Sequence, residues 1–245
     1  MNETLSYADI DFDRQSRTGY PEVIFSTGKT GRQVAEIATQ MLAQGVPRIL
    51  ATKADAGHAA AVKDRFGDSA DVEYHEGAHL IVVREKGWEK QSDENHPPPL
   101  GCIAVVTAGT SDIPIAEEAA LTAEIYGHEV IRIFDVGVAG LHRLLRRLPE
   151  IRRADAVIVC AGMDGALASV VGGLVRQPVI AVPTSVGYGA SMEGLAALLS
   201  MMNSCSLGVC VMNIDNGFGA GHFASMIAGG TQKDTIEEAE KERRK

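Results

Sequence analysis

Residues 157–165 read Val-Ile-Val-Cys-Ala-Gly-Met-Asp-Gly, an apolar run that ends in small, turn-forming residues. The same pattern recurs at residues 105–112, 133–140 and 179–189. A strand whose small terminal residues open a helix is the repeating unit of an open parallel α/β sheet. Ligands of such sheets bind in the crevice at the carboxyl ends of the strands, where small residues let them approach the backbone. The sequence therefore predicts the position of a ligand site, although this pattern alone does not identify the reaction.

The second half of the chain alternates predicted strands and helices. We expect strands at 103–107, 130–134, 156–159, 179–182 and 209–214, and helices at 115–126, 139–148, 166–175, 192–202 and from residue 220. This alternation predicts an α/β fold, a doubly wound sheet with right-handed crossovers.

The first half predicts a smaller α/β domain, residues 1–85. Its expected strands and helices are 23–25, 30–43 (with Thr30 as N-cap), 49–52, 58–66 and 80–83, an order that predicts a parallel-type layer. Residues 86–100 are polar, end in three prolines and are expected to be a linker. A catalytic domain over residues 101–230 and a charged tail over 231–245 complete the predicted organisation.

The composition limits the class of protein. The chain has 245 residues, of which 45% are hydrophobic, and a net charge of −9. This negative charge argues against a nucleic-acid partner, and no apolar run is long enough to span a membrane. The four cysteines have no metal-binding spacing, which is typical of a reduced, cytoplasmic protein.

Two short motifs are interpreted as accidental matches. The string from His75 to His79 reads His-Glu-Gly-Ala-His, like a zinc protease motif, but a strand follows it at once. That motif binds zinc only on a helix. The turn at Gly28, Lys29 and Thr30 lacks the first glycine of a phosphate-binding loop, so a helix start is the better reading, although Lys29 could still touch a phosphate.

Three turns are candidate ligand sites, each with a plain structural alternative. The turn 109–112 offers hydroxyls and N–H groups to a phosphate, and Asp112 could hold a ribose hydroxyl; the alternative is an N-cap. Asp164 opens a helix as either a general base or an N-cap. The turn 215–221 could cradle a diphosphate, with Asp215 on a divalent ion, or could be a glycine-rich corner.

Cys205 lies in a predicted turn with no histidine or basic residue beside it in the sequence. An ordinary cysteine–histidine nucleophile is therefore unsupported. A thiol in this setting would need an electrophile that brings its own positive charge.

The second half of the chain resembles the aminoimidazole ribonucleotide carboxylase/mutase family of purine synthesis. The resemblance rests on residues 111–114, 161–173 and 178–183. It implies a flavodoxin-like sheet and an octamer. That family has its catalytic histidine in a Ser-Ala-His-Arg string after the second strand, where this chain has Asp-Val-Gly-Val-Ala-Gly at 135–140.

A closer resemblance, over about residues 9 to 228, is to the LarB family of nickel-pincer-nucleotide cofactor synthesis. It is carried by the strings at 13–24, 135–140, 183–189 and 203–205. It implies carboxylation of the pyridinium ring of nicotinic acid adenine dinucleotide by CO2. It also implies hydrolysis of the phosphoanhydride, which gives AMP and pyridinium-3,5-biscarboxylic acid mononucleotide.

The LarB resemblance implies Cys205 as the nucleophile and the position of Asp164 as the general base, where we expect Glu in the family. The cationic ring would favour the thiolate. Residues 187–189 and Ser185 are candidates for shaping a CO2 pocket. Arg14, Arg17 and Lys29 are candidates for the adenylate half. The expected substrate-binding set also includes Gly109, Thr110, Ser111, Asp112, Gly137, Gly162, Gly187, Tyr188, Asn203, Ser204, Asp215, Asn216 and Gly217.

No organic cofactor is expected, and a magnesium ion on the diphosphate would aid hydrolysis. The alternatives are an aminoimidazole ribonucleotide carboxylase/mutase, a non-catalytic dinucleotide-binding module, and a zinc hydrolase that uses His75 and His79.

Overall fold

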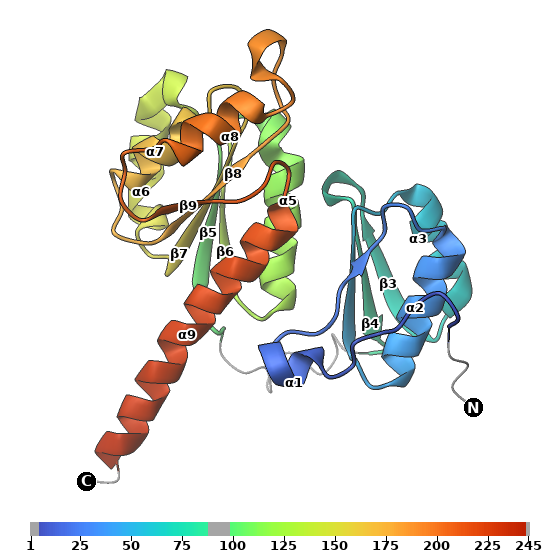
Figure 1. The fold of residues 1–245 in the computed structure, drawn as a ribbon. Helices are drawn as coiled ribbons and strands as arrows, with labels where there is room; N and C mark the ends of the chain where they lie inside the picture. The colour runs from blue at the N-terminus through green and yellow to red at the C-terminus, as the bar shows by residue number, and fades with distance from the viewer. Residues whose placement is uncertain (1–4, 88–98, 244–245) are drawn as a thin grey trace. The chain divides into compact units, whose positions relative to one another are not determined.

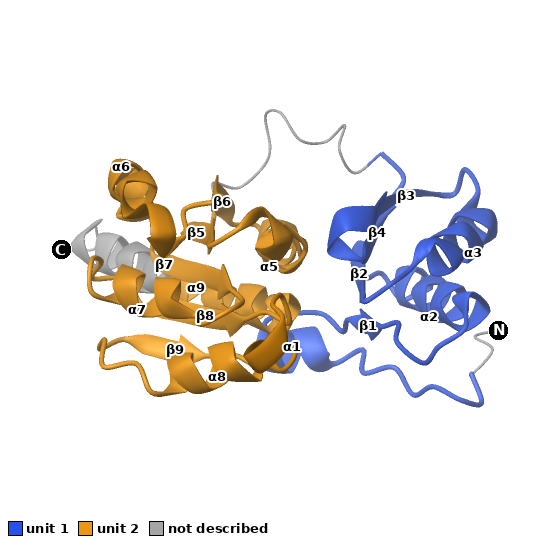
Figure 2. Cartoon of the chain, turned by 90° about the horizontal axis from the view of Figure 1, so that it is seen from above, with its two compact units in different colours: residues 1–97 blue, residues 98–245 orange. Residues whose placement is uncertain are grey.

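The computed structural model describes the backbone of residues 5–87 and 99–243, and the side chains of residues 5–87 and 99–230. The chain divides into two compact units, residues 1–97 and 98–245, each with its own sheet (Figure 2). Most of the predicted linker, residues 88–98, lies outside the described residues.

The second unit contains a five-stranded sheet in the order β6-β5-β7-β8-β9, and every pair in it is parallel. The strands are β5 (Cys102–Thr107), β6 (Glu129–Ile133), β7 (Ala156–Ala161), β8 (Val179–Pro183) and β9 (Val209–Val211). The first strand in sequence lies between the second and the third, which is the flavodoxin-like order. The predicted doubly wound sheet is confirmed.

Helices cover both faces of this sheet (Figure 1). They are α5 (Ile113–Ile125), α6 (Leu141–Ile151), α7 (Ala166–Gly172), α8 (Leu195–Met202) and α9 (Gly217–Arg243), with short 3-10 turns η3 (Thr110–Asp112), η4 (Val138–Gly140) and η5 (Gly189–Ser191). Alanines of α5 and α9 pack on one face, and residues of α6 and α7 pack on the other.

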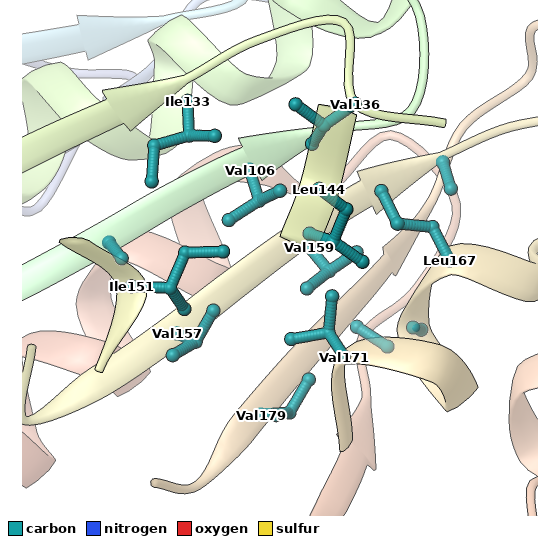
Figure 3. Packing of buried hydrophobic residues seen from close by; sticks show 14 of the residues in the cluster. Val106, Ile133, Val136, Leu144, Ile151, Val157, Val159, Leu167, Val171 and Val179 are labelled. Carbon is teal, nitrogen blue, oxygen red and sulfur yellow. The ribbon is translucent and has the colours of Figure 1, made fainter. Parts of the chain in front are cut away.

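The core beneath α6 and α7 is made of β-branched residues from the strands and leucines from the helices (Figure 3). Val106 and Val159 come from the central strands β5 and β7, and Leu144 and Leu167 come from the helices above them. All four are at most 1% exposed. Strands buried on both faces explain why the sequence shows continuous apolar runs here and no alternation.

The first unit has a four-stranded sheet in the order β1-β2-β4-β3. Its elements are α1 (Arg14–Thr18), β1 (Ile24–Phe25), α2 (Gly31–Ala43), β2 (Arg48–Thr52), α3 (Ala56–Phe66), β3 (Ala70–His75), η1 (Glu76–Ala78) and β4 (Leu80–Glu85). Only β1 and β2 pair in parallel, whereas β4 runs antiparallel to both β2 and β3. The predicted parallel-type layer is therefore wrong, because β3 and β4 form a hairpin.

Local capping explains the helices of the first unit. Thr30 caps α2, as predicted, since its hydroxyl accepts a hydrogen bond from the Gln33 N–H and the Gln33 side-chain oxygen accepts one from the Thr30 N–H. Asp55 and His58 form the same reciprocal arrangement at α3. In the described part of the chain, no helix combines the length and the apolar content needed to cross a membrane.

Candidate active-site cleft

A cleft of about 290 Å³ opens at the carboxyl edge of the parallel sheet, in the second unit. It lies where β5 and β7 end and their following helices diverge, which is the usual ligand position in an open α/β sheet. It is lined by Ala108, Gly109, Ser111, Asp112, Gly137, Val138, Ala139, Arg143, Ala161, Gly162, Met163, Asp164, Ala166, Leu167 and Val186. Its volume is at the lower end of the range for small-molecule pockets.

The first wall of the cleft is the turn after β5, and Asp112 holds it in place. Asp112 is 3% exposed. One carboxylate oxygen accepts the Gly109 N–H at 2.8 Å; the other accepts the Gly162 N–H at 3.1 Å and the Thr184 hydroxyl at 2.6 Å. These contacts join the turns that follow β5, β7 and β8. Asp112 therefore holds the three turns together. Its predicted contact with a ribose hydroxyl stays a prediction.

The second wall is the turn after β7, from Gly162 to Gly165. An added Cβ at Gly162 would lie 2.2 Å from the Val186 carbonyl oxygen, so only glycine fits there. Asp164 is exposed at the rim, and its carboxylate accepts the Ala166 N–H at 3.2 Å, at the start of α7. The carboxylate therefore points to a helix N-terminus and also borders the cleft, which agrees with both sequence interpretations.

The third wall follows β6 and contains a cation that the sequence interpretation missed. Arg143, in the first turn of α6, lines the cleft, and its Nη1 donates to a carboxylate oxygen of Asp135 at 2.7 Å. Asp135 has a positive φ of 59°, and its N–H donates to the buried Thr107 hydroxyl at 3.0 Å. A cation in the first turn of a helix is unfavourable because the helix dipole is positive there, and this is a sequence signal that could have pointed to a functional role.

Predicted residues after β8 and β9 lie near one another at the same edge of the sheet. The Ser185 N–H donates to the Asp215 carboxylate at 2.8 Å. Tyr188 is 80% exposed, and Gly187 is also exposed. Among these residues and the similarly exposed Thr110, none lines the cleft described above.

The glycine-rich turn at the start of α9 packs against α5. An added Cβ would lie 2.2 Å from the Ile115 carbonyl oxygen at Gly217, and 2.5 Å from the Ala119 carbonyl oxygen at Gly221. Asn216 caps the first turn by accepting the Gly219 N–H at 2.8 Å. The structure thus accounts for these residues by helix packing and capping, and their contact with a diphosphate stays a prediction.

Cys205 is exposed, but it does not line the cleft of its own chain. It lies in the loop between α8 and β9, and its neighbours Ser204 and Ser206 bind Ser169 of α7, through the Ser169 hydroxyl at 2.8 Å and the Ser169 carbonyl at 2.7 Å. Asp164 lines the cleft and Cys205 does not, so the two predicted catalytic residues do not line the same pocket of a single chain.

The other three cysteines are poor nucleophiles. Burial raises the pKa of Cys160 well above its usual value, and the nearby Asp112 carboxylate adds to the effect. Burial also raises the pKa of Cys102 to about 11, and it raises that of Cys210.

The predicted cations of the first unit have local partners. Arg14 pairs with Glu22 at 2.9 Å, Arg17 pairs with Asp11, and Lys29 donates to the Phe25 carbonyl at 2.7 Å. Their contact with an adenylate stays a prediction.

The His-Glu-Gly-Ala-His string does not form a zinc-binding helix face. His75 ends β3, residues 76–78 form a 3-10 turn, and His79 has a left-handed backbone before β4. Among the described residues, no group of three histidine, cysteine or acidic side chains is arranged to hold a metal ion.

Comparison with known proteins finds two family models that match this chain. The model of the LarB/PurE-like N-terminal domain matches residues 2–86, and the AIR carboxylase model matches residues 102–245. An uncharacterized protein of Methanocaldococcus jannaschii is 42% identical over 223 residues, which are 89% of this chain and 83% of that protein.

Proposed function

Because this chain belongs to the AIR carboxylase family and carries a LarB/PurE-like N-terminal domain, we propose that it catalyses the LarB reaction. It carboxylates the pyridinium ring of nicotinic acid adenine dinucleotide and hydrolyses the phosphoanhydride. The observation that carries the proposal is the wall after β6. Gly137, Val138 and Ala139 line the cleft there, and no histidine is among its described lining residues. The histidine chemistry of the purine enzymes therefore has no candidate in this cleft.

In the proposed mechanism, the Cys205 thiolate adds to the ring carbon para to the nitrogen. The new C–S bond neutralises the ring charge and leaves an electron-rich enamine. The carbon meta to the nitrogen then attacks CO2 and forms the new C–C bond. Asp164 takes the proton from that carbon. The C–S bond breaks, its electron pair leaves with the thiolate, and the ring becomes aromatic again.

The surroundings of the cleft suit an uncharged co-substrate. CO2 needs a small, dry volume more than a cationic one. Ala161, Leu167 and Val186 supply apolar lining next to Asp164. We assign the shaping of the CO2 pocket to these three residues; a role for Ser185 and residues 187–189, which do not line this cleft, stays a prediction.

We further propose that Cys205 acts in the cleft of a second copy of the chain. The thiol is exposed, and Cys205 is not among the residues that line the cleft of its own chain. Large apolar side chains surround it in sequence, with Leu199 51%, Met202 65% and Leu207 94% exposed. Grouped exposed apolar residues are typical of interaction surfaces. This supports a homo-oligomer, and an octamer is the expectation from the family resemblance.

A magnesium ion on the diphosphate stays part of the proposal. Magnesium commonly binds through one or two carboxylates, substrate phosphates and water. Asp215 is the candidate protein ligand, and its carboxylate already fixes Ser185. The residues present therefore fit a magnesium ion that is held mainly by the diphosphate of the substrate.

The nucleophile is tested with Cys205→Ser. The purified variant is incubated with nicotinic acid adenine dinucleotide and bicarbonate, and the product mass is followed. We expect no carboxylated product, because the serine hydroxyl is a far weaker nucleophile than a thiolate. Cys210→Ala is the control and should keep the activity. Carboxylation at the wild-type rate by Cys205→Ser would remove the thiol from the mechanism.

The base is tested with two changes at Asp164. Asp164→Asn should lower kcat by about 10²- to 10⁴-fold, the usual contribution of a general base. Asp164→Glu should keep or raise the activity, since it retains the carboxylate and matches the residue expected in the family. An Asn variant as fast as wild type would place the base elsewhere.

The purine reaction is the competing function, since the AIR carboxylase match alone also supports it. Wild-type protein is therefore assayed in parallel with aminoimidazole ribonucleotide. Turnover of this ribonucleotide and none of the dinucleotide would decide for the purine enzyme.

A further inference from the structure

We propose that Arg143 binds an oxyanion of the substrate in the cleft. It thereby determines which charged group of the substrate occupies the cleft. The inference rests on the proposed function for the identity of the ligand. Among the described residues that line the cleft, Arg143 carries the one positive charge, and Asp112 and Asp164 carry the negative charges.

Arg143 has donors to offer. A guanidinium has five N–H donors, and here Nη1 donates to Asp135 at 2.7 Å. The side chain is 34% exposed, so the charge is partly withdrawn from water but remains accessible. A planar guanidinium binds two oxygens of a carboxylate or phosphate at once. The group is thus suited to an anion in the cleft.

The guanidinium is held at a fixed position. Asp135 pairs with Arg143, and the Asp135 N–H is fixed by the Thr107 hydroxyl at the end of β5. Gly140 leaves the space that the guanidinium occupies, because an added Cβ there would lie 2.7 Å from Arg143 Nε. A chain of contacts therefore runs from the end of β5 through Asp135 to the guanidinium of Arg143.

The charge balance of the cleft explains why a cation is needed. Without Arg143, the described lining would carry the carboxylates of Asp112 and Asp164 and no positive side chain, and Asp135 would lose its partner. An anionic ligand would then be repelled. The N-terminus of α6, which is 11 residues long, adds positive potential beside Arg143.

The substrate offers two oxyanions, the carboxylate on the ring and the diphosphate. A volume of about 290 Å³ suits one half of the dinucleotide better than the whole. Both groups present the same chemistry to a guanidinium, so the test separates them. Nicotinamide adenine dinucleotide keeps the diphosphate and lacks the ring carboxylate.

The test is Arg143→Gln, with Arg146→Gln as the matched control. Arg146 lies on the same helix, is exposed and does not line the cleft. Binding of nicotinic acid adenine dinucleotide and of nicotinamide adenine dinucleotide is measured by calorimetry on the full chain, and kcat and KM are measured with the acid. Loss of a charged hydrogen bond should weaken binding about 10- to 100-fold. KM should rise more than kcat falls, and Arg146→Gln should match wild type.

The two ligands identify the group that is bound. If Arg143 binds the ring carboxylate, Arg143→Gln weakens the binding of nicotinic acid adenine dinucleotide and leaves the binding of nicotinamide adenine dinucleotide unchanged. If Arg143 binds the diphosphate, the binding of both dinucleotides weakens by the same factor. Equal affinity of Arg143→Gln and wild type for both ligands overturns the inference while leaving the proposed function standing.

The proposed function can also fail separately. If wild type does not turn over the dinucleotide, the same variants are measured with aminoimidazole ribonucleotide, whose phosphate is also an oxyanion. A drop of about 10-fold or more in the affinity for this ribonucleotide, seen in Arg143→Gln and not in Arg146→Gln, would support the inference. Unchanged affinity, or a wild-type chain that binds none of these anions, would overturn it.

Discussion

Cys205 and the three other cysteines have opposite environments. Cys205 is exposed, whereas burial raises the pKa of Cys102 to about 11 and that of Cys160 well above its usual value. A raised pKa keeps the thiol protonated, and only the thiolate is alkylated. At about pH 8, iodoacetamide should therefore modify Cys205 first. Reaction of Cys102 should increase only as the pH approaches its pKa. Mass spectrometry of digested protein measures both, and preferential labelling of Cys160 would contradict the assignment.

Asp112 should contribute to stability through its three acceptor contacts. In Asp112→Asn, the amide NH2 would replace one acceptor oxygen and face an N–H or a hydroxyl. An unsatisfied buried polar group costs about 1–3 kcal/mol. The free energy of unfolding, measured with urea, should fall by that amount. Asp164→Asn is the control: its exposed side chain should change the value by less than about 0.5 kcal/mol.

At the residue scale, the sequence predicted the cleft-lining residues that lie in glycine-rich turns, such as Gly109, Gly137 and Gly162. It did not predict Arg143, because helix periodicity alone makes this residue one of several cations on an amphipathic helix. Its place in the cleft depends on the path of the chain from Asp135 to α6. Nor did the sequence predict that both oxygens of Asp112 face neighbouring turns.

The contact between α5 and α9 depends on residues that lack side-chain bulk. Gly221→Ala would place a methyl group 2.5 Å from the Ala119 carbonyl oxygen. Such overpacking costs about 1–3 kcal/mol, so we expect a lower denaturation midpoint. Gly230→Ala, on the same helix with nothing within 4 Å, should gain up to about 1 kcal/mol of helix propensity. Equal midpoints for the two variants would contradict this account of the helix contact.

At the element scale, the parallel sheet was predictable because its buried strands are continuous apolar runs. The hairpin of the first unit was not, since β3 carries Asp71, Glu73 and His75 and lies at a sheet edge. An edge strand tolerates such polar residues, so its sequence lacks the apolar signal of an inner strand. The short α1 was missed for a related reason: none of its residues is buried.

At the scale of the whole molecule, a shared active site can be tested by mixing variants. Cys205→Ser and Asp164→Asn are each expected to be inactive. If each site takes the cysteine from one copy and the aspartate from another, dissociating and reassembling an equal mixture should restore up to about a quarter of wild-type activity. Activity that does not rise above that of the separate variants would contradict a site built from two copies.

Every described residue that lines the cleft belongs to the second unit, and none comes from residues 5–87. The described side chains that surround the cleft can therefore change without any change in the first unit. If the prediction that Arg14, Arg17 and Lys29 contact the adenylate half is right, exchange of the first unit between relatives would alter the range of accepted nucleotides and leave the cleft residues unchanged.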